Sequence, residues 1–241
     1  MKKIYIALIL SHIFNLNAEV RGQAPNWLWA SGAGTTGQDA FYGIDIDVNG
    51  NSHVTGSFGS SSSIVFGSTT LTGAGGSDIM IVKYDDSGNV IWAKRAGGTF
   101  SESAVSVDVD ANGNSYITGN FDSPSIAFGS TVLTSGGQAD FFIAKYDATG
   151  NEVWAKSAGR LGGDHGTSVS TDVNGNVYAT GYFRSDTIYF GSVMLTNSGS
   201  DDIFVVKYDP AGNVLWAKKV GAAGSDYANS IGIDTDGNIY V

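Results

Sequence analysis

The sequence predicts an all-β fold that repeats one four-stranded unit. The first observation is a tryptophan that recurs after 63, 62 and 62 residues, at Trp29, Trp92, Trp154 and Trp216. A fixed period of this length indicates copies of one supersecondary unit. The second observation is composition: 34 Gly, 3 Pro and only 15% charged residues, against an average of about 25%. The third is an apolar–polar alternation over residues 104–110, which is the period of a β-strand.

The copy that starts at Trp92 shows the elements of the unit most clearly. Val105, Val107 and Val109 lie on one face of its first strand. Asn112-Gly113 then predicts a type I′ hairpin turn, in which both central residues have positive φ. The insertion after the second strand predicts a small extra hairpin around Gly129-Ser130, and no helix is expected after the N-terminal leader. The predicted strands are residues 104–110, 115–121, 140–146 and 153–156.

Four antiparallel strands per repeat, with no helix, are typical of a β-propeller blade. We therefore expect an incomplete β-propeller of about three and a half blades, with about 62 residues in each, from a sequence that is an N-terminal fragment. Residues 25–34 are expected to be an orphan fourth strand that completes a blade built from both ends of the chain. Complete blades are predicted at residues 39–97, 102–159 and 164–221, and a partial fourth blade at residues 226–241.

Residues 1–24 are expected to be a signal peptide. Lys2 and Lys3 supply the positive start and residues 4–10 the apolar core. Cleavage is expected after Ala18 or Ala24. Because this apolar run is much shorter than the roughly 20 residues of a membrane span, we expect an exported protein that is secreted or held on the outer cell surface. We expect no membrane span in the mature chain.

Charge excludes two classes of partner. The net charge of the chain is −10 and its isoelectric point is about 4.5. No basic stripe is available to displace counterions from phosphates, so nucleic acid is not expected as a partner. Anionic lipid is excluded for the same electrostatic reason.

One run of residues forms a pattern that returns in the other units: Trp92, Gly97-Gly98, Glu102, Asp110, Gly113-Asn114, Tyr116 and Gly119. This run resembles the SBBP β-propeller repeat. The resemblance covers most of the chain after the leader and implies a repeat type rather than an activity. The longer unit, with its Phe-Gly and Lys-Tyr-Asp signatures, is similar to secreted proteins of Bacteroidota-type bacteria, which often end in a type IX secretion sorting domain.

An acidic residue precedes the first strand of every unit. In a propeller these residues would lie on one rim of the central channel, where they could bind a cation or a hydroxyl-rich ligand. The alternative, which we favour, is a capping role in a Gly-rich turn. His165 is found in one unit only, so it is the better functional candidate among the histidines, whereas His53 takes a position held elsewhere by tyrosine and is expected in the core. The rim series is Asp39, Glu102, Asp164, His165 and Asp226.

Asp-rich turns follow the first strands of the units. Two of them match the first half of a calcium loop, but the glutamate that such a loop needs at its twelfth position is replaced by glycine, at Gly56 and Gly119. We favour hairpin turns in which Asp caps backbone N–H groups, and calcium stays as the alternative. The residues of the calcium alternative are Asp45, Asp47, Asn49, Asp108, Asp110 and Asn112. The expected structural turn residues are Asp47, Asp110, Asp172 and Asp234.

The segment from Asp147 to Trp154 resembles the tryptophan-docking repeat of quinone-dependent dehydrogenases. Its glycine comes three residues after Asp instead of four, and the chain has no cysteine. The sialidase Asp-box is a second relative with a different Gly–Trp spacing. Both departures favour a structural role, in which Trp29, Trp92, Trp154 and Trp216 pack blade against blade.

These patterns favour an exported, non-catalytic binding or surface-display module for glycans or another surface protein, with no cofactor other than the calcium alternative. Its recognition loops are expected near residues 57–77, 120–139 and 182–201, since rigid sheets present variable loops at a rim. Tyr182 could stack on a sugar there, while Phe58, Phe121 and Phe183 are expected in the core. One alternative is a polysaccharide-acting or quinone-dependent enzyme whose active rim lies in further blades. Another is a structural spacer in a large adhesin.

Overall fold

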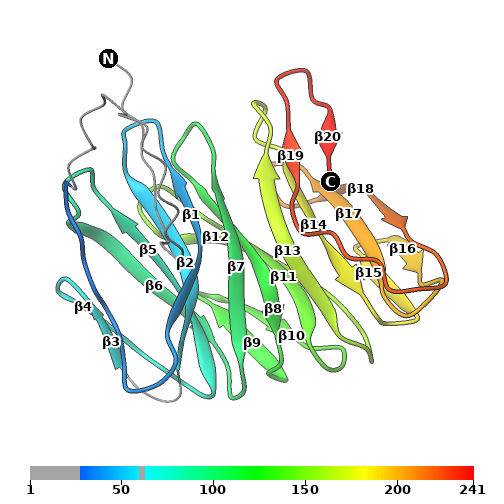
Figure 1. Ribbon diagram of the computed structural model, residues 1–241, viewed down its shortest axis with the longest axis horizontal. Coiled ribbons are helices and arrows are strands. Elements are labelled where there is room, and N and C mark those ends of the chain that lie inside the picture. The colour runs from blue at the N-terminus through cyan, green and yellow to red at the C-terminus, as the bar shows by residue number, and fades with distance from the viewer. Residues whose placement is uncertain (1–27, 60–62) are drawn as a thin grey trace, which may run out of the picture.

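The computed structural model describes residues 28–59 and 63–241, and within them every regular element is a β-strand. The main strands form three four-stranded antiparallel sheets that stand side by side (Figure 1). We call these sheets units 1, 2 and 3. The predicted all-β fold of propeller-like blades is confirmed, and the sheets do not close into a ring.

Each unit runs in strand order first, second, third, fourth, with a two-stranded hairpin between its second and third strands. Unit 1 has β1 (Ala40–Ile46), β2 (Ser52–Gly59), β5 (Ser77–Tyr84) and β6 (Val90–Gly97), with the hairpin β3 (Ser63–Phe66) and β4 (Thr69–Thr72). Unit 2 has β7 (Glu102–Val109), β8 (Ser115–Phe121), β11 (Asp140–Tyr146) and β12 (Glu152–Ala158), with β9 (Ser125–Phe128) and β10 (Thr131–Thr134). Unit 3 has β13 (Asp164–Thr171), β14 (Val177–Phe183), β17 (Asp202–Tyr208) and β18 (Val214–Val220), with β15 (Thr187–Phe190) and β16 (Val193–Thr196).

Two short strands, β19 (Gly232–Ile233) and β20 (Ile239–Tyr240), follow unit 3 and pair with each other. One sheet extends beyond its own unit. The hairpin strand β9 of unit 2 pairs with β6 of unit 1 at Ala96–Phe128 and Gly97–Ala127, which makes a six-stranded sheet. The main strands of one unit do not pair with the main strands of another.

Two hydrophobic cores lie between neighbouring sheets, and a third consists of unit 1 residues with Trp29 packed against them. On the third strand of unit 2, Phe142 packs toward unit 1, while Phe141 and Ile143 pack toward unit 3. This confirms the prediction of a strand that is apolar on both faces. Phe58, Phe121 and Phe183 are fully buried, as expected.

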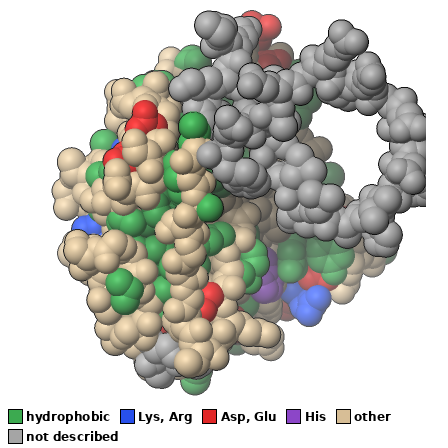
Figure 2. All heavy atoms as spheres, turned by 60° about the vertical axis from the view of Figure 1, so that its left-hand side comes forward, with side chains coloured by type: hydrophobic (Ala, Val, Ile, Leu, Met, Phe, Trp, Pro, Cys, Tyr) green, Lys and Arg blue, Asp and Glu red, His purple; other side chains and the backbone are tan. Residues whose placement is uncertain are grey.

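The outer face of unit 1 has no described sheet against it. Ile44 on β1 is 63% exposed, whereas its repeat equivalent Val107 is 7% exposed because unit 1 covers it. Figure 2 turns this side of the molecule forward, and hydrophobic side chains lie there among backbone and polar atoms.

Residues 28–34 are not in a β-strand in the described chain, and they approach unit 1 through the ring of Trp29; residues 25–27 lie outside the described residues. The expected partners of this fourth strand are the first three strands of another blade, so its place in such a blade stays a prediction.

The turn type predicted at Asn112-Gly113 is wrong, because the turn is not type I′. Gly113 N–H donates to the Asp110 carbonyl, and Asp110 N–H donates to the Asn114 carbonyl. This is a three-residue loop in which Gly113 takes the left-handed position, with φ of +77°.

Candidate functional site

The acidic residue at the start of each repeat, which precedes the first strand or is its first residue, closes its own loop. Its carboxylate accepts the backbone N–H of the residue four positions earlier, which ties the ends of the Gly-rich segment together. The four bonds are Thr35 to Asp39 (2.5 Å), Gly98 to Glu102 (2.9 Å), Arg160 to Asp164 (3.0 Å) and Ala222 to Asp226 (2.9 Å).

The same carboxylates also bind the segment that leaves the second strand. Asp39 accepts the N–H of Gly59, Glu102 accepts the Ser123 hydroxyl, and Asp164 accepts the Ser185 hydroxyl at 2.6 Å. Glu102 and Asp164 are buried, and this burial raises the pKa of both carboxyls, although their hydrogen bonds act in the opposite direction. The geometry is that of a clamp between two loops.

The carboxylates of the turn aspartates accept hydrogen bonds from donors of their own hairpins. In unit 2, Asp110 accepts the N–H groups of Asn112 and Asn114, the Asn114 side-chain amide and the Tyr116 hydroxyl. Equivalent bonds surround Asp47, Asp172 and Asp234.

The other two aspartates of the calcium alternative, Asp45 and Asp108, bind the next unit instead of their own turn. Asp45 accepts the N–H of Val109 at 2.7 Å, and Asp108 accepts the N–H and the hydroxyl of Thr171, at 2.9 and 2.6 Å. Both bonds link a unit to the next one. Asn49 donates its backbone N–H to Asp47. Within the described part of the chain, no three acidic, histidine or cysteine side chains come together as a metal site.

The recurrent tryptophan joins each unit to the next. Trp92 lies over Gly150 in the last turn of unit 2, its ring is 6.5 Å from that of Tyr146, and its indole N–H donates to the Ala148 carbonyl. Trp154 lies in the same way over Gly212 and donates to Pro210. Trp29 lies over Gly88, and Trp216 contacts Tyr178 of its own unit. Gly is required in these turns because its φ is positive and a side chain would meet the indole.

His53 lies in the core of unit 1. Its ring packs edge-on against Trp92, and Nδ1 lies 2.6 Å from the Ser115 hydroxyl. Burial lowers the pKa of His53 to about 4, so the imidazole is neutral at pH 7. This confirms the expected packing role.

An aromatic cluster surrounds His165. The imidazole stacks on Tyr182 with ring centres 4.9 Å apart, and Tyr182 meets Tyr227 edge to face at 4.7 Å. Burial lowers the pKa of His165, although the nearby carboxylates of Asp122 and Asp164 oppose this effect. We call His165, Tyr182 and Tyr227 the aromatic cluster.

An ion pair borders the aromatic cluster. Arg184 holds the buried carboxylate of Asp201 through two parallel bonds of 3.0 and 3.1 Å, and the hydroxyls of Ser225 and Tyr227 donate to the same carboxylate. Although burial acts in the opposite direction, these bonds hold the pKa of Asp201 below its usual value. The side chain of Arg184 is 59% exposed, and Tyr227 is 50% exposed.

Sequence reasoning found His165 and Tyr182 but missed Tyr227 and the pair Arg184–Asp201. The missed signal is a departure from the repeat. The equivalent positions in unit 2 are occupied by Ser103, Asn120, Asp122 and Ala139, so unit 3 and the start of the next repeat carry aromatic and charged side chains where unit 2 has small polar, acidic or apolar ones.

Comparisons with known proteins agree with this architecture. Residues 215–241 match the family described as SBBP, beta-propeller repeat. The chain is 33% identical over 177 residues to an uncharacterized WD repeat-containing protein, L264, of Acanthamoeba polyphaga mimivirus, over 66% of this chain and 13% of that protein. It is 29% identical over 180 residues to the regulatory protein FlaEY of Caulobacter vibrioides, over 70% of this chain and 19% of that protein. The chain thus spans less than a fifth of either relative.

The chain is therefore a repeat protein of propeller type. Among the described residues there is no helix with the length and hydrophobicity needed to cross a bilayer.

Proposed function

We propose that this protein is a non-catalytic binding module that recognises a glycan or another surface protein through the aromatic cluster and the adjoining Arg184–Asp201 pair. The observation that carries the proposal is that these side chains depart from the repeat and gather at one place. Positions that recur in every unit serve the fold, as the clamps, turns and tryptophans do. A departure shared by several neighbouring positions favours recognition instead.

The chemistry of the cluster suits a ligand with both apolar and polar surface. Tyr227 is 50% exposed, and its ring packs edge to face with the ring of Tyr182. Tyrosine supplies rigid contact area with a polar tip and is enriched at interfaces. Arg184 is held flat by Asp201, so its outward N–H groups are placed for a ligand oxygen.

The proposal includes export of the protein from the cell. Residues 1–24 have the charge and hydrophobicity of a signal peptide and lie outside the described residues. We place the mature protein outside the cell, on the surface or secreted, by a route that could include type IX secretion. The name of FlaEY, a regulatory protein, adds support for protein contacts as one form of this recognition.

A glycan array probed with the whole chain tests the proposal. We expect binding to a carbohydrate, and loss of that binding in the double variant His165→Ser, Tyr182→Asn, which takes the residues of unit 2. The control is Tyr189→Ala, which removes an exposed tyrosine from the hairpin of the same unit and takes the residue of unit 2, Ala127. Binding that survives the double variant and is lost with the control would contradict the proposal. An array with no signal would remove the glycan version.

A further inference from the structure

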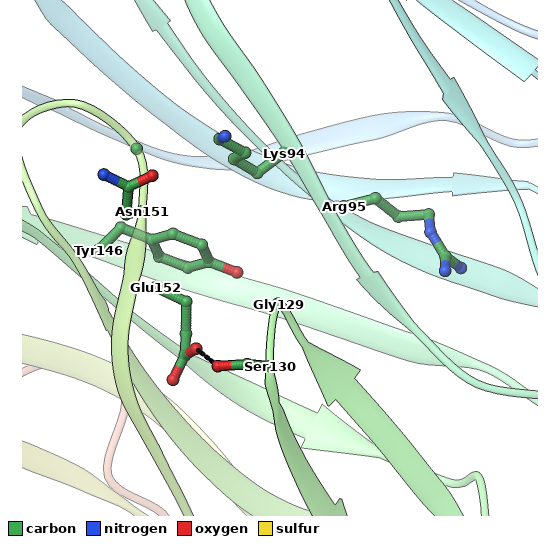
Figure 3. Close-up of a pocket in the computed structure, with 8 residues that line it drawn as sticks. Lys94, Arg95, Gly129, Ser130, Tyr146, Asn151 and Glu152 are labelled. Atoms are coloured by element: carbon green, nitrogen blue, oxygen red, sulfur yellow. Dashed lines mark hydrogen bonds between the residues drawn. The ribbon is translucent and has the colours of Figure 1, made fainter.

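We infer that the groove between units 1 and 2 binds one ring of a neutral, hydroxyl-rich ligand such as a sugar. The groove has a volume of about 300 Å³ and is lined by Lys94 and Arg95 of β6, the turn Gly129-Ser130 of the hairpin, and Tyr146 and Glu152 of unit 2 (Figure 3). The volume is at the lower end of the roughly 300–1,000 Å³ of small-molecule sites. The site lies away from the aromatic cluster, so this inference goes beyond the proposed function.

The Tyr146 hydroxyl is a donor without an acceptor. Tyr146 is only 2% exposed, and its oxygen has no hydrogen-bond partner and almost no accessible surface; the ring is directed toward the groove and the oxygen lies at its inner end (Figure 3). Burial raises the pKa of the phenol, so the proton stays on the oxygen at neutral pH. A buried hydroxyl with no partner is unfavourable, and a hydrogen bond to a ligand oxygen would remove that cost.

Glu152 supplies the acceptor. Its two carboxylate oxygens accept the hydroxyls of Thr131 at 2.6 Å and Ser130 at 3.1 Å. A carboxylate has about four acceptor positions, so each oxygen keeps capacity for a ligand hydroxyl.

The charges of the groove favour a neutral ligand. Arg95 is committed to Asp78 through a bond of 2.7 Å. Lys94 makes no hydrogen bond or ion pair with another described residue, so its ammonium and the Glu152 carboxylate are the charges that remain for a ligand. The Glu152 carboxylate would repel an anion, and the Lys94 ammonium would repel a cation. A hydroxyl group can donate to the carboxylate and accept from the phenol or the ammonium.

The repeat provides a matched comparison. The equivalent groove between units 2 and 3 has a volume of about 410 Å³ and keeps Lys156 and Tyr208, but it has Ser157 for Arg95 and Val214 for Glu152. Unit 1 also has valine, Val90, at the position of Glu152. Glutamate is therefore not needed to close the hairpin, and its presence in one groove supports a role toward a ligand.

Two variants keep the fold and remove the recognition. Glu152→Val installs the residue that two other units carry. Tyr146→Phe removes only the unpartnered hydroxyl, so we expect a stability equal to or above that of the parent. Both should weaken ligand binding, by about tenfold for Glu152→Val and about threefold to tenfold for Tyr146→Phe, since each removes one hydrogen-bonding group.

The experiment is an amide NMR titration of the whole chain with galactose, mannose, glucose and N-acetylglucosamine, with sodium sulfate and sodium acetate as anionic probes. We expect saturable shifts at Ser130 and Asn151 with at least one neutral sugar and weaker ones in both variants. The aromatic-cluster variant Tyr182→Asn should leave these shifts unchanged, which separates this site from the aromatic cluster. The inference is overturned if none of the four sugars shifts these amides, if Glu152→Val binds as the parent does, or if an anion binds in place of the sugars.

Discussion

At the scale of the residue, the carboxylate at one repeat position has different neighbours in the three units. An aspartate lies at the first or second position of the third strand of each unit, as Asp78, Asp140 and Asp202. In unit 1 it pairs with Arg95, and in unit 3 it pairs with Lys219. In unit 2 the cation is replaced by Ser157.

Because of that replacement, the Asp140 carboxylate has no cation beside it among the described residues. Asp140 is 1% exposed, and its Oδ1 has no partner. Burial raises the pKa of Asp140 from 3.8 to about 6, while the Gly136 N–H and the Ser135 hydroxyl oppose this effect only in part.

This predicts a pH dependence of stability. Because the folded state holds the proton more tightly than the unfolded chain, the free energy of unfolding falls as pH rises from about 4 to about 6 and stays lower above that range. Asp140→Asn should therefore be more stable than the parent at pH 8, by about 1–3 kcal/mol, and nearly equal to it at pH 4. Urea unfolding at both pH values measures this difference.

Ser157→Lys is the companion variant, since it restores the cation that unit 3 has. It should also stabilise the protein at pH 8, by lowering the pKa of Asp140 instead of removing its charge. Equal stability of parent and both variants at pH 8 would show that Asp140 does not carry the penalty we assign to it.

The sequence was informative about residues that recur and uninformative about residues that meet across units. The turn aspartates are visible in the pattern Asp-x-x-Gly-Asn, because all their bonds are local. Tyr227 lies 45 residues after Tyr182 in the chain. Nothing in either local pattern indicates that the two rings meet edge to face.

At the scale of the element, a bulge in the first strand leaves no room for a side chain at one glycine of the second strand. The pairing of the first and second strands shifts register between Ala104 and Ser106 in unit 2, and the chain there passes close to Gly119. A Cβ on Gly119 would lie 1.9 Å from the Ser103 carbonyl oxygen. Gly56 and Gly181 meet the same obstacle in the other units.

Gly119→Ala should destabilise the protein by about 3 kcal/mol or more, because the methyl group meets backbone atoms that cannot move without breaking the ladder. The matched control is Gly232→Ala, where a Cβ would have no atom within 4 Å. Thermal unfolding of the two variants gives the comparison. A Gly119→Ala protein as stable as the control would contradict the bulge geometry.

The order of strands could be predicted because apolar alternation and turn residues are local signals. The turn type could not, since Asn-Gly also fits a loop in which Gly alone has positive φ. The strand predicted around Trp29 has no ladder partner among the described residues, and a single apolar segment cannot specify such a partner.

At the scale of the whole molecule, stability is distributed over the contacts between units. Two of the hydrophobic cores are each shared by two sheets, so units 1, 2 and 3 bury their facing sides against one another. Trp92 and Trp154 connect these sheets through the last turn of the following unit.

Trp154→Phe should therefore destabilise the protein by about 1–3 kcal/mol, through the lost indole bond to Pro210 and the smaller ring. Trp216 provides the internal control: among the described residues its indole N–H has no acceptor, and no turn glycine lies under its ring. Trp216→Phe should cost less. Equal losses of free energy from the two variants, measured by urea unfolding, would argue against a joining role.

The period of about 62 residues was enough to predict the class of fold, because equal spacing of one strand implies equal sheets. It could not predict that β9 continues the sheet of unit 1, since that pairing joins two units. Export and the identity of the ligand stay predictions.

The central claim is that successive sheets are joined by one tryptophan lying over the last turn of the next sheet. The most direct measurement is the proton NMR spectrum of the folded chain. The account predicts cross-relaxation between the indole protons of Trp92 and the Hα protons of Gly150, and likewise between Trp154 and Gly212, with the glycine resonances shifted upfield by the rings. Ordinary glycine shifts, with no contact between these pairs, would contradict it.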